Sequence, residues 1–303
     1  MLRHLATLAD WDTQGIWELL ELAAHLKREH RAGVSHQQVL EGKTLGMVFQ
    51  KPSLRTRVSF EVGMNQLGGR ALYMGPEEIK LGQRETTEDI AIVLSRYVDG
   101  IMARVFGHEV IEELARYATV PVINGLSDLY HPCQALGDML TIWEKKRVLE
   151  GLTLTYIGDG NNVAHSLIMA CTKLGLAFRI ACPAGHEPKR EVVAQANELG
   201  GQVDILHDPR VAAKGADVLY TDVWTSMGQE VETEERVNVF QGFTVDEEMI
   251  GTAGRGCIVL HCLPAHYGEE ITYEASRHLA SALFDQAENR LHAQKAALAS
   301  LLD

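Results

Sequence analysis

The 303-residue sequence contains no uncharged run that approaches the ~20 apolar residues needed to cross a bilayer. Its first ten residues, Met1–Asp10, hold neither an apolar signal core nor an Arg/Ser-rich transit pattern. These absences argue against a membrane-spanning protein and favour a soluble cytoplasmic one.

Basic residues are also scarce, with 28 Lys and Arg against 41 Asp and Glu, for a formal net charge of −13. The overall field of such a chain repels nucleic acid and anionic lipid, so we expect neither as a partner. An anionic substrate would need a local cluster of arginines or lysines to hold it.

Cysteines are few, and none of the five lies in a CxxC pair. Most are therefore expected to be buried thiols. The segment His261–His266 contains a His-Cys-x3-His pattern, but it lacks a second ligand pair at the spacing of structural zinc sites. We therefore predict no metal there.

What is present resembles an ordinary globular protein, with 46% hydrophobic and 23% charged residues. Short apolar runs alternate with amphipathic segments. The predicted strands are 44–50, 98–103, 120–124, 152–157, 178–182, 203–206, 217–221 and 257–261. The predicted helices are 58–67, 108–117, 132–149, 162–174, 189–199 and 286–302. Strands separated by helices predict right-handed βαβ units and parallel sheets.

The best boundary is the long helix 132–149, because a new strand begins just after it. We therefore predict an α/β fold of two doubly wound parallel-sheet domains joined by interdomain helices. The first domain is residues 1–133, with the C-terminal helix 286–303 packing back on it. Residues 134–150 form the bridge and 151–285 the second domain. The acidic stretch Gly228–Gly242 is predicted to be a long loop, either a lid or a solvated surface.

Two segments suggest ligand binding in the first domain. Ser53–Arg57 (SLRTR) follows a strand and opens a helix, where free backbone N–H groups, hydroxyls and the forks of Arg55 and Arg57 suit a phosphate. The alternative is an ordinary N-cap serine followed by surface arginines. His131 and Gln134 lie one helical turn apart and can orient a planar amide, although a capping His and a surface Gln remain possible.

Two further segments lie at strand ends of the second domain. Asp222, followed by a Ser- and Gly-containing loop, suits an amine-bearing ligand, with a simple Asx-turn as the alternative. Gly158–Val163 (GDGNNV) begins like a dinucleotide fingerprint, but Val163 replaces the third glycine. A dehydrogenase would rest on that segment alone.

Taken together, these segments resemble the aspartate/ornithine carbamoyltransferase family over nearly the whole chain. The resemblance is carried by the motifs SxRTR (Ser53–Arg57), HPxQ (His131–Gln134) and HCLP (His261–Pro264), and by Asp222–Gly228 and Ala287–Leu291. It implies transfer of the carbamoyl group of carbamoyl phosphate to the side-chain amine of L-ornithine, giving L-citrulline and phosphate. Neither a metal nor an organic cofactor is implied, since carbamoyl phosphate is already activated.

The resemblance also implies residue roles. For carbamoyl phosphate it indicates Ser53, Leu54, Arg55, Thr56, Lys80, Arg104, His131, Gln134, Cys262, Leu263 and Arg290. For ornithine it indicates Asn162, Asp222, Ser226 and Met227. Arg104, His131 and Cys262 are the implied catalytic residues. Leu54 and Lys80 depart from commoner family residues, which are Thr and Gln.

The family implies a homotrimer, or an assembly of trimers, with active sites between domains and near subunit interfaces. Other readings remain open at this stage. The chain could be a dehydrogenase or a non-catalytic module with the same fold, and within the family putrescine or a modified ornithine could be the acceptor.

Overall fold

The computed structural model describes residues 3–79, 81, 84–225 and 233–303. The chain divides into two compact units. The first comprises the residues up to Leu140 together with Asn289–Asp303, and the second is Thr141–Glu288. Both boundaries fall inside helices, namely α6 (Pro132–Lys146) and α13 (Leu283–Leu302).

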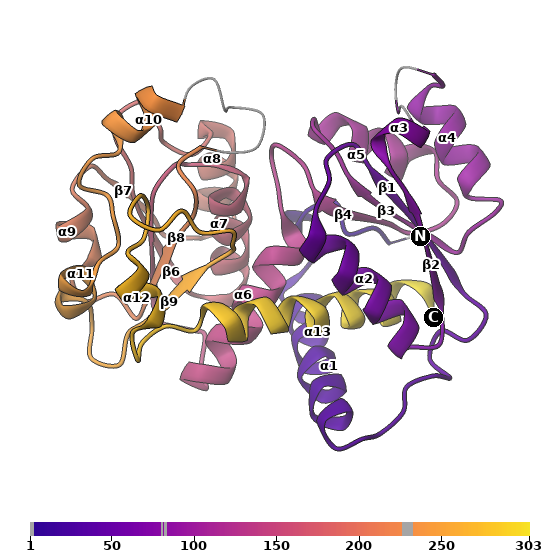
Figure 1. The fold of residues 1–303 in the computed structure, drawn as a ribbon, viewed down its shortest axis with the longest axis horizontal. Helices are drawn as coiled ribbons and strands as arrows, with labels where there is room; N and C mark the ends of the chain where they lie inside the picture. The colour runs from indigo at the N-terminus through magenta and orange to yellow at the C-terminus, as the bar shows by residue number, and fades with distance from the viewer. Residues whose placement is uncertain (1–2, 80, 82–83, 226–232) are drawn as a thin grey trace. The chain divides into compact units, whose positions relative to one another are not determined.

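The first unit is built on a parallel sheet whose described strands follow the order β2-β1-β3-β4 (Figure 1). The strands are β1 (Thr44–Phe49), β2 (Arg70–Met74), β3 (Gly100–Arg104) and β4 (Val122–Leu126). The helices are α1 (Thr13–Arg31), α2 (Leu54–Gln66), α3 (Pro76–Ile79), α4 (Thr87–Leu94) and α5 (His108–Tyr117), after a short 3-10 turn at Leu8–Asp10. Strands β1 and β3 are almost wholly buried, as expected of strands covered on both faces.

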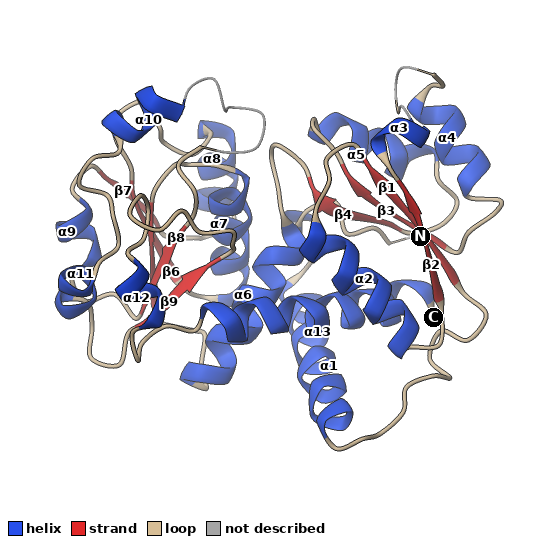
Figure 2. Cartoon of the chain, in the orientation of Figure 1, coloured by secondary structure: helices blue, strands red, loops and turns tan. Residues whose placement is uncertain are grey.

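The second unit contains a parallel sheet with described strands in the order β7-β6-β5-β8-β9. The strands are β5 (Thr153–Ile157), β6 (Ala177–Ala181), β7 (Val203–Leu206), β8 (Val218–Thr221) and β9 (Ile258–His261). The helices are α7 (Asn162–Leu174), α8 (Arg190–Glu198), α9 (Pro209–Ala213), α10 (Thr233–Val239), α11 (Glu247–Thr252) and α12 (Tyr273–Arg277), and they flank the sheet (Figure 2).

The predicted fold class is confirmed, because both sheets are parallel and both are wound with helices. Predicted strands match within about three residues at each end, and α5, α7 and β7 have the predicted bounds. The elements that were not predicted include α1, β2 and α4, together with the short helices α3, α9, α11 and α12. One prediction was wrong. Part of the expected loop Gly228–Gly242 is helix α10, and the part before it lies outside the described residues.

No helix in the described ranges is both long and apolar enough to cross a membrane.

Candidate active site

In each unit, chemically active side chains follow the carboxyl ends of neighbouring strands. In the first unit the segment after β1 carries Ser53–Thr56, β3 ends at Arg104, and His131 follows β4. The chain winds one way from β1 to β2 and the other way from β3 to β4, so β1 and β3 flank a topological switch point. Such points are where open α/β sheets bind ligands.

Local hydrogen bonds fix the start of α2, which follows the carboxyl end of β1. Ser53 is the N-cap, and its hydroxyl accepts from the Thr56 backbone N–H at 3.4 Å. It also donates to Thr56 Oγ1 at 3.1 Å. Thr56 is fully buried, and its Oγ1 accepts from Arg290 Nη2 at 3.1 Å. This bond joins Thr56 and Arg290, which are 234 positions apart in the sequence.

The side chain of His131 is affected by the positive charges of three arginines. Burial lowers its pKa well below the usual value, and the charges of Arg290, Arg104 and Arg55 lower it further. His131, Arg104 and Arg290 are each at least nine-tenths buried. The imidazole is therefore neutral at pH 7 and can donate a hydrogen bond without carrying charge, while the guanidinium groups supply the charge for an anion.

Gln134 presents an acceptor beside this group. Its Nε2 donates to Asp138 Oδ1 at 2.8 Å, which fixes the amide orientation. Its Oε1 is buried and, among the described residues, has no hydrogen-bond partner. A ligand N–H group would satisfy it. Nearby, Gly137 lets the backbone of Arg290 approach closely, because a Cβ there would lie 3.2 Å from Arg290 N.

Two residues of the Ser53–Arg57 motif face elsewhere. Arg57 is exposed, donates to Glu61 Oε1 at 2.9 Å, and lies over the Tyr73 ring with 4.1 Å to its centroid. The prediction that Arg57 adds a second fork beside Arg55 was therefore wrong. Leu54 is 77% exposed, so only its backbone, in the first turn of α2, is placed to bind an anion. We call the remaining residues the His131 cluster: Ser53, Arg55, Thr56, Arg104, His131, Gln134 and Arg290.

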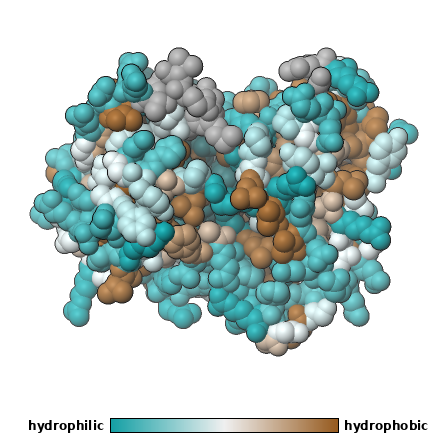
Figure 3. Space-filling view, viewed as in Figure 1, coloured by the Kyte–Doolittle hydropathy of each residue, from teal (hydrophilic) through white to brown (hydrophobic). Residues whose placement is uncertain are grey.

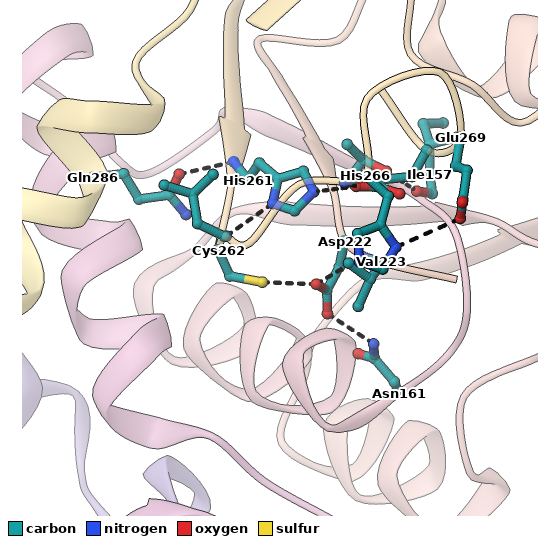
Figure 4. A network of polar contacts seen from close by, with 12 residues as sticks. Ile157, Asn161, Asp222, Val223, His261, Cys262, His266, Glu269 and Gln286 are labelled. Atoms are coloured by element: carbon teal, nitrogen blue, oxygen red, sulfur yellow. Dashed lines mark hydrogen bonds and ion pairs between the residues drawn. The ribbon is translucent and has the colours of Figure 1, made fainter. Parts of the chain in front are cut away.

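In the second unit, β5 and β8 flank the switch point, and Asp222 follows β8 (Figure 4). Asp222 is 5% exposed and heavily hydrogen-bonded. Its Oδ1 accepts from Cys262 Sγ at 2.8 Å and from the Val223 N–H at 2.8 Å, and its Oδ2 accepts from Asn161 Nδ2 at 2.9 Å. A carboxylate held this way is positioned to receive a cationic or amine-bearing ligand.

One of these partners, Asn161, is itself fixed by the start of a helix. Asn161 is the N-cap of α7, since its Oδ1 accepts from the N–H groups of Val163 and Ala164. Its neighbour Asn162, the residue indicated by sequence, is the first residue of the helix. Asn161 was not predicted, and the adjacent Asn pair explains why, because only the cap geometry distinguishes the two.

His261 is fixed in one tautomer by its surroundings. Its Nδ1 accepts from the Leu263 N–H at 2.8 Å, so Nε2 carries the proton and donates to Glu270 Oε1 at 3.0 Å. Both side chains are fully buried. Leu263 has a φ of 56°, which is rare for a branched residue, and the bond to His261 helps to hold it. We call Asn161, Asp222, His261, Cys262 and Glu270 the Asp222 cluster.

The glycine-rich turn Gly158–Val163 does not offer a dinucleotide site. In such a site the second glycine leaves space for a pyrophosphate. Here a Cβ at Gly160 would lie 2.2 Å from Pro188 N, and the Gly160 N–H donates to the His186 carbonyl at 2.8 Å. The chain's own backbone fills that space, which argues against the dehydrogenase reading.

His261 and His266 do not share a set of potential metal ligands. Within the part of the chain described, ligand-type atoms converge in two groups, Asp222–His261–Cys262 and His266–Glu269–Glu270. In the first group the Cys262 and Asp222 atoms bond to each other, and both nitrogens of His261 are used. The His-Cys-x3-His segment is therefore not one four-residue site.

Some predicted residues lie outside the described residues, and others belong to a different unit from the one that their predicted role suggests. Lys80, Ser226 and Met227 lie outside the described residues. Cys262 and Leu263, which the resemblance associates with carbamoyl phosphate, belong to the second unit, where the Cys262 thiol donates to Asp222 and the Leu263 N–H donates to His261. Glu270 was missed by sequence reasoning, because nothing local marks it as buried.

Known proteins match the whole chain. The description "aspartate/ornithine carbamoyltransferase, carbamoyl-P binding domain" matches residues 3–144, and "aspartate/ornithine carbamoyltransferase, Asp/Orn binding domain" matches residues 150–301. The chain belongs to the aspartate/ornithine carbamoyltransferase family, as its motifs predicted.

Within that family it is similar to proteins named ornithine carbamoyltransferase. The protein of Pyrococcus abyssi is 54% identical over 304 residues, which cover 99% of this chain and 96% of that protein. The solved structure of the Pyrococcus furiosus protein has a TM-score of 0.96 at 54% identity, covering 99% of this chain and 97% of its own. The Thermus thermophilus structure has a TM-score of 0.91 at 46% identity, with full coverage of both chains.

Proposed function

We propose that this protein is an ornithine carbamoyltransferase, which converts carbamoyl phosphate and L-ornithine to L-citrulline and phosphate. The amine nitrogen forms a bond to the carbamoyl carbon, the bond from that carbon to the phosphate oxygen breaks, and phosphate leaves with the electron pair. The amine loses a proton, which the departing phosphate can accept. The observation that carries the proposal is the buried group of His131, Arg104 and Arg290, in which Arg290 is hydrogen-bonded to Thr56 at the start of α2.

The first unit is proposed to bind carbamoyl phosphate through the His131 cluster. Ser53, Arg55 and the open N–H groups at the start of α2 hold the phosphate, since an anion is favoured at a helix N-terminus. Thr56, Arg104 and His131 donate to the carbonyl oxygen as it becomes an oxyanion.

Two further residues of the cluster complete this assignment. Arg290 neutralises charge while it anchors Thr56. Gln134 Oε1 accepts from the carbamoyl N–H, which is consistent with its buried, fixed amide.

The second unit is proposed to bind ornithine through the Asp222 cluster. Asp222 and Asn162, with Ser226 and Met227 assigned from sequence alone, orient the amino-acid end. Cys262 orients the substrate or handles the proton. It is not a covalent nucleophile, because the amine can attack the carbamoyl carbon directly. Cys262 and Leu263 backbone groups and Lys80 remain proposed carbamoyl phosphate contacts from resemblance.

We further propose a homotrimer that acts in the cytoplasm. Helix α2 presents Leu54, Val58 and Val62 to solvent at 77%, 45% and 37% exposure, a stripe at helical spacing on the element that starts the phosphate site. Apolar patches also interrupt the mostly hydrophilic surface seen in Figure 3. None of the five cysteines forms a disulfide, which is consistent with a reducing compartment. Light scattering after size-exclusion chromatography measures the oligomer.

The test of activity is citrulline formation from carbamoyl phosphate with a panel of acceptors: ornithine, putrescine, aspartate and N-acetylornithine. Ornithine should be used far better than the other three. A protein that forms no citrulline, or prefers another acceptor, contradicts the proposal. The Pyrococcus furiosus relative is named anabolic, which supports a biosynthetic role in arginine metabolism.

A further inference from the structure

A buried arginine outside the Asp222 cluster links the two loops on which that cluster depends. Arg236 lies on α10 and is 7% exposed. Its Nε donates to the Trp224 carbonyl oxygen at 2.6 Å, and its Nη2 forms an ion pair with Asp159 Oδ2 at 2.6 Å. One rigid guanidinium group therefore fixes the distance between a point after β8 and a point after β5.

These two points lie next to the residues that form the proposed ornithine site. Trp224 is two residues after Asp222, and Asp159 is two residues before Asn161. Asn161 and Asp222 are themselves joined by a 2.9 Å hydrogen bond. The two loops are thus connected twice, once inside the cluster and once through Arg236.

The surroundings of Arg236 make this second connection stiff. Trp224 and Phe240 stack with 5.6 Å between ring centroids, and the His186 ring packs edge-on against Phe240 at 4.9 Å. His186 Nδ1 also contacts Asp159 Oδ1 at 3.2 Å. Phe240 and Trp224 belong to the apolar core of the second unit. Movement of either loop would therefore disturb core packing as well as the ion pair.

The Asp159 carboxylate is held by Arg236 and His186. Its side chain is largely desolvated, which raises its pKa, and Arg236 and His186 oppose that shift by stabilising the charged form. A carboxylate in such surroundings is costly unless it is well paired. Asp159 therefore depends on its pairing with Arg236.

We propose that Arg236 and Asp159 are positioning residues for the acceptor substrate: they hold the Asp222 loop and the Asn161 turn in register, and neither touches the reacting atoms. This inference rests on the proposed function. Loss of the pair should weaken ornithine binding, because misplacement of a site by about 1 Å can cost about 10²-fold. The His131 cluster, which belongs to the other unit, should keep its affinity for carbamoyl phosphate.

The experiment compares wild type with Arg236→Gln, Arg236→Lys, Asp159→Asn and the double variant Arg236→Gln/Asp159→Asn. The matched control is Arg210→Gln, because Arg210 forms two hydrogen bonds with Asp246, of 3.0 and 2.7 Å, in the same unit but contacts neither loop. We expect the KM for ornithine to rise tenfold or more in Arg236→Gln, with kcat and the KM for carbamoyl phosphate within about threefold of wild type. Arg236→Lys should fall in between, and the double variant should be no worse than the worse single one.

Binding of norvaline, an ornithine analogue without the reacting amine, to enzyme saturated with carbamoyl phosphate should weaken in parallel. Arg210→Gln should lower the melting temperature but leave the KM for ornithine unchanged. Equal KM values in wild type and the pair variants, or equal increases in Arg210→Gln, would overturn the inference. If Arg236→Gln does not fold, Arg236→Lys and Asp159→Asn decide by the same comparison. A wild-type protein that makes no citrulline would instead overturn the proposed function.

Discussion

Both units contain a parallel sheet with a topological switch point, and they differ in the charge of the side chains gathered at that edge. In both, polar side chains follow strands that flank a switch point in a parallel sheet. In the first unit Arg55 and Arg104, together with Arg290 from α13, lower the pKa of His131 and leave it neutral. In the second unit the central group is Asp222, held by an amide and a thiol.

This difference shows that the fold supplies the location and the side chains supply the specificity. A chain with net charge −13 repels anions in general, yet it gathers three guanidinium groups at one sheet edge. If the proposed function is correct, the charge of each ligand is recognised by groups within a few ångströms and not by the field of the whole protein.

The largest expected effect is that of Asp222→Ala, which removes the central acidic group of the second unit. We expect kcat/KM for ornithine to fall by about 10³-fold or more, since removal of one partner of a buried charge pair costs about 2–5 kcal/mol. Wild type should prefer ornithine to putrescine by about 10⁴-fold, and the variant should lose most of that preference. Steady-state kinetics with both acceptors measures this. Carbamoyl phosphate binding, measured by calorimetry, should be unchanged, and a variant that keeps its preference would mean that Asp222 is not the acceptor group.

Arg55→Ala tests the other side of the comparison. It removes a charge-assisted fork worth about 3 kcal/mol, so we expect the affinity for carbamoyl phosphate to fall by at least about 10²-fold. No ornithine concentration should rescue turnover. The control is Arg57→Ala, because Arg57 lies on the same helix but pairs with Glu61. Similar losses in the two variants would show that general charge, and not the His131 cluster, binds the phosphate.

The pH should change the efficiency with which ornithine is used. The attacking amine resembles that of lysine, with a pKa of about 10.4, so kcat/KM for ornithine should rise about tenfold per pH unit between pH 6.5 and 9. The pKa of His131 is held below its usual value, so this imidazole stays neutral over that range. Its titration therefore adds no further change to the pH profile of kcat/KM. The pH profile of kcat/KM for ornithine provides the measurement. A flat profile would be inconsistent with attack by a neutral amine.

The smallest expected effect concerns the packing behind the His131 cluster. Gly137→Ala places a methyl group 3.2 Å from Arg290 N and 3.3 Å from its Cα, so we expect a loss of about 1–3 kcal/mol in unfolding free energy. Gly251→Ala is the control, because nothing lies within 4 Å of its Cβ position. Urea denaturation compares the two. Equal stabilities would mean that α13 can shift without cost.

Much of the site was predictable because its residues lie in short local motifs at strand ends. Ser53, His131, Asp222 and Cys262 each follow a predicted strand or open a predicted helix, and the structure places them at sheet edges. The sign of the charge in each unit also followed from those motifs.

What could not be predicted depends on contacts between residues distant in sequence. Arg236 follows a run of glutamates that indicates a solvated loop, and its burial is explained by contacts with the Trp224 carbonyl and Asp159. Arg57 fits the phosphate motif, but its (i, i+4) partner Glu61 and the Tyr73 ring hold it elsewhere. Strand β2 is partly exposed and pairs on one side only, so its apolar pattern is weak.

Because Cys262 contacts Asp222, chemical modification of this thiol can report on the proposed acceptor site. Cys262 is the one cysteine of five that is not buried. Burial raises the pKa of Cys133 and Cys182 to about 12 and that of Cys257 to about 11, so these thiols are poor nucleophiles at neutral pH. A thiol reagent added in small excess should modify one group per chain and so count competent sites in a preparation, and the degree to which an acceptor slows that reaction reports its occupancy without any turnover.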